Sequence, residues 1–359
     1  MEQGVVMTTR KWRVAVVGLG HWYSAYGTAR ALREYPRAEL VAAACNDDAQ
    51  REAFTTTFGV KGYKHYADLL EHEDVDIVFI AAPVSELRDV TVLSAKAGKH
   101  MILGKPMAMT IEQADEMVEA VEASGVSCLP FQGIMRFQGA ELKARVDRGD
   151  IGDLIVVHQT SRWSIAEDAY NSGTPGWFVD PKHVPGGAFI DEGIYGIDFL
   201  SWIAGSDIVE VEARMANLVH KELAVEDWGM ATFTLANGLV GTLEGSWTIN
   251  APRKTAPSPK NNSVVRIELV GSRGEIIDQW FREPGRAILA AGASDWVFER
   301  NSRPSYGPAV PFPLNILIDS LDAGQKPIVS IRDARKAFAV AMAAYEAART
   351  RRPVRIPGA

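Results

Sequence analysis

The first 131 residues of this 359-residue chain alternate between short apolar segments and segments with a helical pattern. Helical segments separate five expected strands, which lie at Lys11–Gly18, Glu39–Cys45, Asp76–Ala82, His100–Leu103 and Val126–Phe131. The third of these runs is apolar throughout, which is typical of a parallel strand that is covered on both faces. Repeated β-α-β units therefore predict a doubly wound parallel sheet with right-handed crossovers.

Beyond residue 131 the pattern changes. Short turns such as Ala236-Asn237-Gly238 join a second set of expected strands, at Leu154–Gln159, Val209–Arg214, Met230–Leu235, Val240–Trp247 and Val264–Val270. Residues 250–262 and 285–313 are expected to be irregular, and Ile331–Arg349 has the pattern of an amphipathic helix. We therefore expect two domains, residues 1–131 and 132–359, the second with an antiparallel sheet that has helices on one face.

Composition excludes several classes of protein. Hydrophobic residues make up 47% of the chain and charged residues 23%, which suits a globular protein. A net charge of −7 argues against nucleic acid as a partner. The longest apolar run, Ile77–Val84, is far shorter than the ~20 residues of a membrane span. The start of the chain lacks the features of a secretory signal and is interpreted as a frayed leader. Cys45 and Cys128, in apolar segments, fit buried free thiols in the cytoplasm.

A glycine-rich turn joins the first strand to the first helix. Gly18 permits a tight turn there, and Gly20 lets the backbone approach a pyrophosphate, whose charge the N-terminus of the helix stabilises. His21 and Trp22 open that helix and belong to the expected binding segment. The third position of the fingerprint is Tyr23 in place of glycine, and we expect it to displace the helix or redirect the loop. The turn predicts a Rossmann domain that binds a dinucleotide, and the alternative is a plain strand-to-helix turn.

The end of the second strand carries polar residues. Asn46 falls where NAD enzymes have an acidic residue that binds the ribose hydroxyls. Asp47 and Asp48 would repel a 2′-phosphate, whereas Arg51 would attract one, and on balance we expect NAD and consider NADP the weaker alternative. The structural alternative, which applies above all to Asp48, is a cluster that caps the next helix.

Two further segments place reactive side chains at defined positions. Lys105 follows the strand His100–Leu103, at the edge where α/β sheets bind ligands, and Pro106 stops that strand. Asp191 and Tyr195 are spaced four residues apart, so that a helix would place a carboxylate and a phenol on one face. Such a pair suits substrate binding and proton transfer. The alternatives are a surface lysine, a capping Asp191 and a Tyr195 in the core.

Together these segments resemble the Gfo/Idh/MocA family of NAD(P)-dependent oxidoreductases. The resemblance covers nearly the whole chain and rests on the glycine turn, residues 73–83, 97–100 and 105–106, the pattern Gly186-Gly187-x-x-x-Asp191-x-Gly193-x-Tyr195, and residues 238–247 and 344–348. It implies a Rossmann domain followed by an α/β domain with a large, mostly antiparallel open sheet. It also implies a homodimer or homotetramer formed through that sheet.

The resemblance also implies roles for particular residues. Lys105 matches the catalytic lysine, and Asp191 matches a carboxylate that binds substrate hydroxyls. Tyr195 stands where the inositol dehydrogenase branch has histidine, and a neighbouring lysine ammonium would lower its pKa toward a range useful for acid–base work. Ala82, Pro83 and Pro106 complete the expected cofactor-binding set.

The sequence also departs from the pattern of the family at three places. Gly104 replaces the glutamate before the lysine, the residues after Pro83 read Val84-Ser85-Glu86-Leu87, and Tyr23 replaces the third glycine. These departures suggest a branch with an altered cofactor pocket or a different net reaction.

The expected substrate side is rich in tryptophan and arginine. The resemblance places Trp163 and Trp177 near the substrate, where indole faces can stack on sugars. Arg136 and Arg162 would meet an anionic group on the sugar, although a solvated cation is the common alternative for each. Trp202 and Trp247 are interpreted as core residues, and no cluster has metal-ligand spacing.

Three functions fit these features. The first is a dehydrogenase or reductase that moves a hydride between a carbinol carbon of a sugar or polyol and nicotinamide. The second is an NAD-dependent glycoside hydrolase that oxidises the sugar ring transiently and recycles NAD. The third is a dinucleotide-sensing regulator without catalysis, against which the presence of Lys105, Asp191 and Tyr195 argues.

Overall fold

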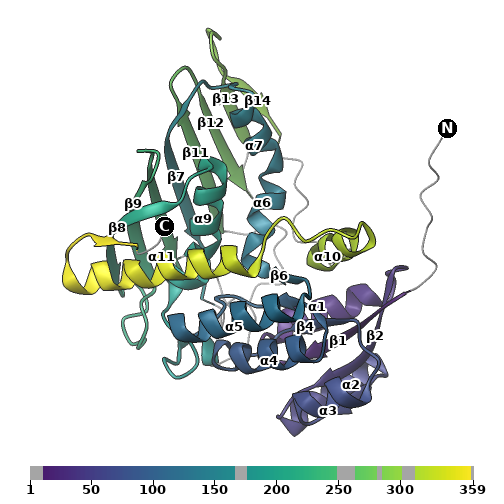
Figure 1. Cartoon of the computed structure of the whole chain (residues 1–359). Coiled ribbons are helices and arrows are strands. Elements are labelled where there is room, and N and C mark those ends of the chain that lie inside the picture. The colour runs from purple at the N-terminus through teal and green to yellow at the C-terminus, as the bar shows by residue number, and fades with distance from the viewer. Residues whose placement is uncertain (1–10, 166–175, 249–262, 281–284, 301–311, 357–359) are drawn as a thin grey trace, which may run out of the picture. The chain divides into compact units, whose positions relative to one another are not determined.

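The structure is a computed structural model, and it describes residues 11–165, 176–248, 263–280, 285–300 and 312–356 (Figure 1). The chain divides into two compact units. Among the described residues, the first unit contains those up to 107, residues 112–131 and residues 312–332, and the second contains the rest. The chain passes from the first unit to the second after residue 131, and residues 312–332, near its end, belong to the first unit.

The first unit is built on a six-stranded parallel sheet with the strand order β3-β2-β1-β4-β5-β6. Its strands are β1 (Trp12–Val17), β2 (Ala38–Ala44), β3 (Lys61–Tyr63), β4 (Ile77–Ile80), β5 (His100–Leu103) and β6 (Cys128–Pro130). This order is that of the Rossmann fold, and it confirms the predicted doubly wound sheet. The adjacent strands β1 and β4 start the two halves of the sheet, so ligands are expected at their carboxyl ends.

Helices cover the parallel sheet. They are α1 (Trp22–Leu32), α2 (Asp48–Phe58), α3 (Tyr66–His72), α4 (Val84–Lys96), α5 (Ile111–Ser124) and, from near the end of the chain, α10 (Phe312–Asp322). All four residues of β4 are buried, as a strand covered on both faces requires. Helix α10 is fixed to this unit by Arg37, whose guanidinium lies 2.5 Å from Asp319 and 2.8 Å from Asp322.

The second unit contains a nine-stranded, mostly antiparallel sheet with the order β14-β13-β12-β11-β7-β10-β9-β8-β15. Only β7 and β10 pair in parallel. The strands are β7 (Leu154–Arg162), β8 (Ile208–Ala216), β9 (Trp228–Leu235), β10 (Val240–Ser246), β11 (Val264–Gly271), β12 (Glu275–Trp280), β13 (Arg286–Leu289), β14 (Val297–Glu299) and β15 (Val354–Arg355). The expected large open sheet is thereby confirmed.

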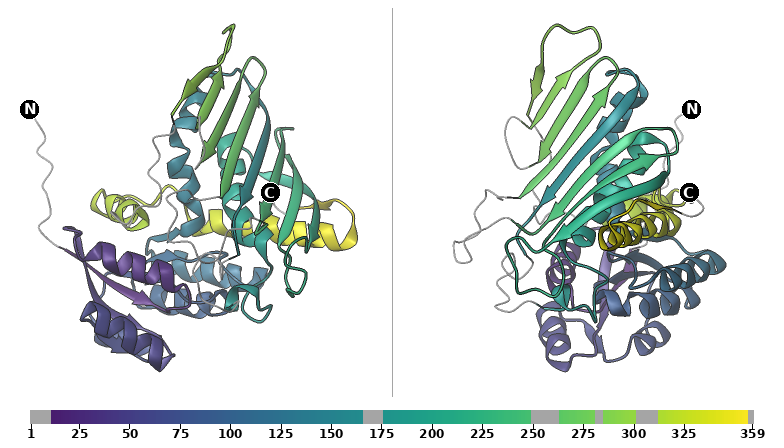
Figure 2. Two further views of the ribbon diagram at one scale, coloured as in Figure 1. Left: turned by 180° about the vertical axis from the view of Figure 1, so that it is seen from behind. Right: turned by 90° about the vertical axis from the view of Figure 1, so that its left-hand side faces the viewer.

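One face of this sheet carries the helix α9 (Ala188–Ala204), and the other is open in the described part of the unit (Figure 2). The Gln159 amide on β7 donates to the Gly196 carbonyl of α9 at 2.9 Å, which identifies the covered face. Because side chains alternate along a strand, Arg162 on β7 points to the open face. The unit also contains η1 (Phe131–Gly133), α6 (Ile134–Gln138), α7 (Ala140–Asp147), η2 (Trp177–Val179) and α11 (Ile331–Thr350).

Two parts of the sequence-based prediction were wrong or incomplete. Residues 285–313 were expected to be irregular, but β13 and β14 lie within them. The strands β3 and β12 and the helix α3 were not predicted. The expected loop at 250–262 and the leader lie outside the described residues. No helix in the described ranges is long and apolar enough to cross a membrane.

Candidate functional site

The glycine-rich turn lies at the carboxyl end of β1, against the end of β4. Gly18 has a φ of +76°, and a Cβ on it would lie 2.5 Å from the Cα of Ala82. A Cβ on Gly20 would lie 2.7 Å from the Pro83 ring. Both positions therefore require glycine for the close approach of two chain segments, besides any approach to a pyrophosphate.

The helix α1 begins directly after this turn. Its N-cap residue His21 is buried, its backbone N–H donates to the Ala81 carbonyl at 2.9 Å, and its side chain makes no capping hydrogen bond. The first turn holds no acidic residue, and Trp22 is 41% exposed. A positive helix terminus without a carboxylate fits a dinucleotide pyrophosphate. The ring of Tyr23 packs edge-on against those of His21 and Trp22, so the turn accommodates tyrosine in place of the third glycine.

The polar residues after β2 have different hydrogen-bond partners. Asp47 caps α2, because its carboxylate accepts the Gln50 N–H at 2.9 Å, so the capping alternative applies to Asp47 and not to Asp48. Asp48 instead lies 2.6 Å from Arg51, which also donates to the Cys45 carbonyl at 2.7 Å. The Arg51 guanidinium is thus already hydrogen-bonded twice within the protein.

A cluster that sequence reasoning missed adjoins this strand end. The Tyr66 hydroxyl lies 3.1 Å from the Asn46 side-chain oxygen and donates to the Glu86 carboxylate. Burial, and after it the hydrogen bond to Glu86, raise the pKa of Tyr66. The cluster brings the Glu86 carboxylate of α4 to the end of β2. No pattern in the sequence indicates that Tyr66 and Glu86, twenty positions apart, are hydrogen-bonded.

Lys105 follows β5 and is 8% exposed. A cis peptide bond joins it to Pro106. A Cβ on the preceding Gly104 would lie 3.5 Å from both the Leu87 side chain and the Ile80 carbonyl, which is ordinary contact. The surroundings therefore leave room for a side chain at position 104. Packing does not explain why glycine replaces the glutamate that the family pattern has before the lysine.

Asp191 and Tyr195 both lie on α9, one turn apart, and both are half-buried. The predicted helix is thus confirmed. The Trp247 indole N–H donates to the Asp191 carboxylate at 3.1 Å. Trp247 is 1% exposed, as expected of a core residue, yet it also holds the Asp191 carboxylate. That contact could not be inferred from the sequence, because the two residues are 56 positions apart.

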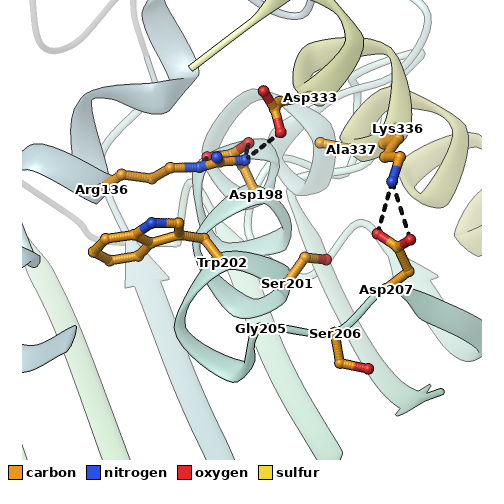
Figure 3. A pocket seen from close by; sticks show the side chains of 10 residues that line it. All are labelled: Arg136, Asp198, Ser201, Trp202, Gly205, Ser206, Asp207, Asp333, Lys336 and Ala337. Carbon is orange, nitrogen blue, oxygen red and sulfur yellow. Dashed lines mark hydrogen bonds and ion pairs between the residues drawn. The ribbon is translucent and has the colours of Figure 1, made fainter. Parts of the chain in front are cut away.

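The two arginines expected to bind substrate have other partners. Arg136 is buried, with two hydrogen bonds of 2.7 Å to Asp198 and one of 3.1 Å to Asp333. It lines a pocket of about 210 Å³ between the end of α9 and the start of α11, together with Trp202, Asp207 and Lys336 among others (Figure 3). Two carboxylates thus compensate the charge of Arg136 within the protein, which favours a structural role over the expected binding of an anion.

Arg162 is separated from the helix α9. It extends from the open face of the sheet and pairs with Glu244 at 2.8 and 2.6 Å, whereas α9 lies on the opposite face. The structure therefore does not bring Arg162 together with Asp191 and Tyr195, contrary to the expectation. The Trp163 indole donates to the Ser161 hydroxyl at 2.9 Å, and Trp177 stacks on Phe178 with ring centroids 4.0 Å apart.

No group of three or more histidine, cysteine or acidic residues in the described ranges could hold a metal ion. The first unit offers the glycine-rich turn and the Lys105 ammonium, and the second unit offers the Asp191 carboxylate and the Tyr195 phenol on one helix.

The two units match two family models. Residues 12–131 match an oxidoreductase family with an NAD-binding Rossmann fold, and residues 140–277 match the GFO/IDH/MocA C-terminal domain. The fold and the glycine turn thus belong to an NAD-binding oxidoreductase. Since the two matches span well over half of the sequence, the chain belongs to the GFO/IDH/MocA oxidoreductase family.

Relatives with assigned activities match over nearly the full length. The chain is 26% identical over 351 residues to scyllo-inositol 2-dehydrogenase (NAD(+)) of Bacillus subtilis, which covers 96% of both chains. It is 27% identical over 359 residues to myo-inositol 2-dehydrogenase of Thermotoga maritima, covering 96% of this chain and 98% of the relative. A solved structure, levoglucosan dehydrogenase in complex with NADH and L-sorbose, is similar in fold, with a TM-score of 0.82, 20% identity and coverage of 97% and 99%.

Proposed function

We propose that the protein is an NAD-dependent dehydrogenase or reductase of a sugar or polyol. The observation that carries the proposal is the Asp191–Tyr195 pair on one face of α9, with the Asp191 carboxylate fixed by the buried Trp247. A carboxylate orients hydroxyl groups, and a phenol one turn away exchanges a proton with one of them. The named relatives act on inositols, which are polyols, and this supports the same substrate class here.

The proposed roles follow from the chemistry of each side chain. Tyr195 takes the proton of the reacting hydroxyl during oxidation and returns it during reduction. Lys105 stabilises the negative charge that develops on the same oxygen, and Asp191 orients the neighbouring hydroxyls. A bound nicotinamide dinucleotide supplies the hydride acceptor or donor.

We also propose that the cofactor is NAD and not NADP. Asp47 is exposed at the end of β2, and the Tyr66 hydroxyl draws the Glu86 carboxylate toward Asn46. Both carboxylates disfavour a 2′-phosphate. Arg51, the cation nearest in sequence, is engaged by Asp48 and the Cys45 carbonyl, which supports the same preference.

For the assembly and its location we propose a cytoplasmic homodimer or homotetramer formed through the open sheet face. Met230 and Val240, which are 46% and 38% exposed, contribute apolar surface to that face. Cys45 and Cys128 are buried free thiols, which suits a reducing compartment. Sedimentation of wild-type protein and of Met230→Glu tests the assembly: a wild-type monomer contradicts it.

The activity is tested with NAD⁺ and a panel of myo-inositol, scyllo-inositol, glucose and nitrophenyl glucosides. We expect absorbance of reduced nicotinamide to rise with at least one polyol or sugar. Release of nitrophenol without net reduction would indicate the glycosidase alternative. Bound NAD with neither signal would indicate the regulator.

Substitutions test the assigned roles. Lys105→Ala and Tyr195→Phe should each lower turnover by about 10²–10⁴-fold and leave NAD affinity nearly unchanged. The double variant should be little worse than the worse single variant, because the two groups serve the same oxygen. Tyr63→Phe is the matched control, since it also removes a phenol, one that donates to Glu73 at the sheet edge. Full turnover in Tyr195→Phe contradicts the mechanism.

A further inference from the structure

The helix that carries Asp191 and Tyr195 starts without a side-chain cap of its own. Its N-cap is Gly187, which has no side chain and therefore makes no side-chain capping hydrogen bond. The first N–H groups of a helix have no partner within the helix, and when they are buried they need acceptors from elsewhere.

Glu226, just before β9, supplies most of these acceptors. Both oxygens of its carboxylate lie 3.0 Å from the Gly187 N–H, and one of them lies 3.0 Å from the Phe189 N–H. Its backbone carbonyl accepts the Ala188 N–H at 2.9 Å. A single residue from the segment before β9 thus accepts three consecutive N–H groups at the start of α9.

Tyr345 on α11 completes the arrangement. Its hydroxyl accepts the Ile190 N–H at 3.3 Å and donates to the Glu226 carboxylate at 2.6 Å. Every N–H group from Gly187 to Ile190 therefore has an acceptor on Glu226 or Tyr345. Burial raises the pKa of both groups. A buried polar group that loses a hydrogen bond costs free energy, so the bond between the two side chains stabilises the arrangement.

The glycine pair before α9 has its explanation in these two residues. A Cβ on Gly186 would lie 2.1 Å from the Tyr345 hydroxyl oxygen, and one on Gly187 would lie 2.0 Å from the Glu226 carbonyl oxygen. Neither glycine has a positive φ, so the requirement is space and not backbone conformation. The pair leaves room for the Glu226 backbone and the Tyr345 phenol to pack against the start of the helix.

The same strand segment also fixes the functional side chains. The residue after Glu226, Asp227, accepts the Trp247 backbone N–H at 2.8 Å through its carbonyl, and the Trp247 indole holds Asp191. The helix is thus held at its first turn from two directions, by the Glu226–Tyr345 pair at its start and by Trp247 at Asp191.

We infer that Glu226 and Tyr345 are positioning residues of the reaction: by capping α9 from outside, they fix the rotation of the helix about its axis and so the direction of Tyr195. The inference rests on the proposed function of Tyr195. An error of about 1 Å in the placement of a reacting group can cost on the order of 10²-fold in rate, so a small rotation matters.

The test uses Tyr345→Phe and Glu226→Gln in the full-length protein, with Tyr63→Phe as the control for loss of a phenol–carboxylate hydrogen bond elsewhere. We expect both variants to lower kcat by about 10- to 100-fold while KM and NAD affinity change less than threefold. In the Tyr195→Phe background, Tyr345→Phe should change kcat less than threefold, because the group that it positions is gone.

Amide hydrogen exchange gives a readout that needs no substrate. Exchange at residues 187–190 should become faster in Tyr345→Phe, while exchange in β9 and β10 should stay unchanged. Unchanged exchange at these amides, or an equal loss of kcat with and without the Tyr195 hydroxyl, overturns the inference. If Tyr195→Phe alone retains full turnover, the proposed function fails, whereas faster exchange still supports the cap; the two failures are therefore distinguishable.

Discussion

Substitutions in the Arg136–Asp198 ion pair can decide whether Arg136 stabilises the fold or binds the substrate. Asp198 has a fully buried side chain, and Arg136 holds it with two hydrogen bonds of 2.7 Å. Arg136→Met keeps the apolar stem but leaves this carboxylate without its countercharge. Breaking a buried pair by removing one partner costs roughly 3–5 kcal/mol of the free energy of unfolding.

The double variant Arg136→Met with Asp198→Leu replaces the whole pair by apolar side chains. Such replacements are often neutral or stabilising, so most of the lost stability should return. Asp333 also loses a partner, but its side chain is 31% exposed and hydration compensates for most of that loss.

Urea unfolding followed by tryptophan fluorescence measures both effects, because most of the nine tryptophans lie in the second unit. The reasoning fails if Arg136→Met is as stable as the wild type. A double variant that regains stability but has a KM raised more than tenfold would also refute it, because the guanidinium would then serve the substrate, as expected from the sequence.

Three further predictions are independent of that pair. Gly20→Val should weaken NAD binding at least tenfold, about 1.4 kcal/mol by calorimetry, and unchanged affinity in the folded variant contradicts the assignment of the turn. Trp247→Phe, which keeps an aromatic side chain but loses the indole N–H, should lower kcat/KM about tenfold; an unchanged value would mean that the contact with Asp191 is not used. Burial raises the pKa of the Cys128 thiol, so only the unfolded chain ionises it near pH 9, and stability should fall as pH rises beyond that value. Above that pH, the free energy of unfolding of the Cys128→Ala variant should fall less steeply than that of the wild type, by about 1.4 kcal/mol per pH unit. Equal dependence on pH in the two proteins would contradict the burial of the thiol.

The sequence predicted those elements whose side chains follow a simple pattern. The buried runs of β1 and β4 and the four-residue spacing of Asp191 and Tyr195 needed only local periodicity. Strand β12 was missed because one of its inward positions is Asp278, whose charge is compensated by Arg286 on β13. A carboxylate at a core position breaks the apolar alternation that identifies a strand.

The candidate site was predicted in part for the same reason. The glycine turn, Lys105 and the pair on α9 are visible as motifs, but their supports are not. Glu226 and Tyr345 lie 39 and 155 positions from the N–H groups that they accept, and only the glycine pair hints at them. The ion pair of Arg136 was not predicted, because a buried countercharge 62 positions away leaves no trace in local sequence.

The return of residues 312–332 to the first unit affects how this protein can be recombined with its relatives. Arg37 and Trp12 in the N-terminal part both hydrogen-bond to side chains of α10. A chimera cut once after residue 131 would give the transplanted nucleotide-binding module a foreign α10, with no assurance of partners for these side chains. An exchange of modules therefore needs three junctions, so that both pieces of the module come from the same parent.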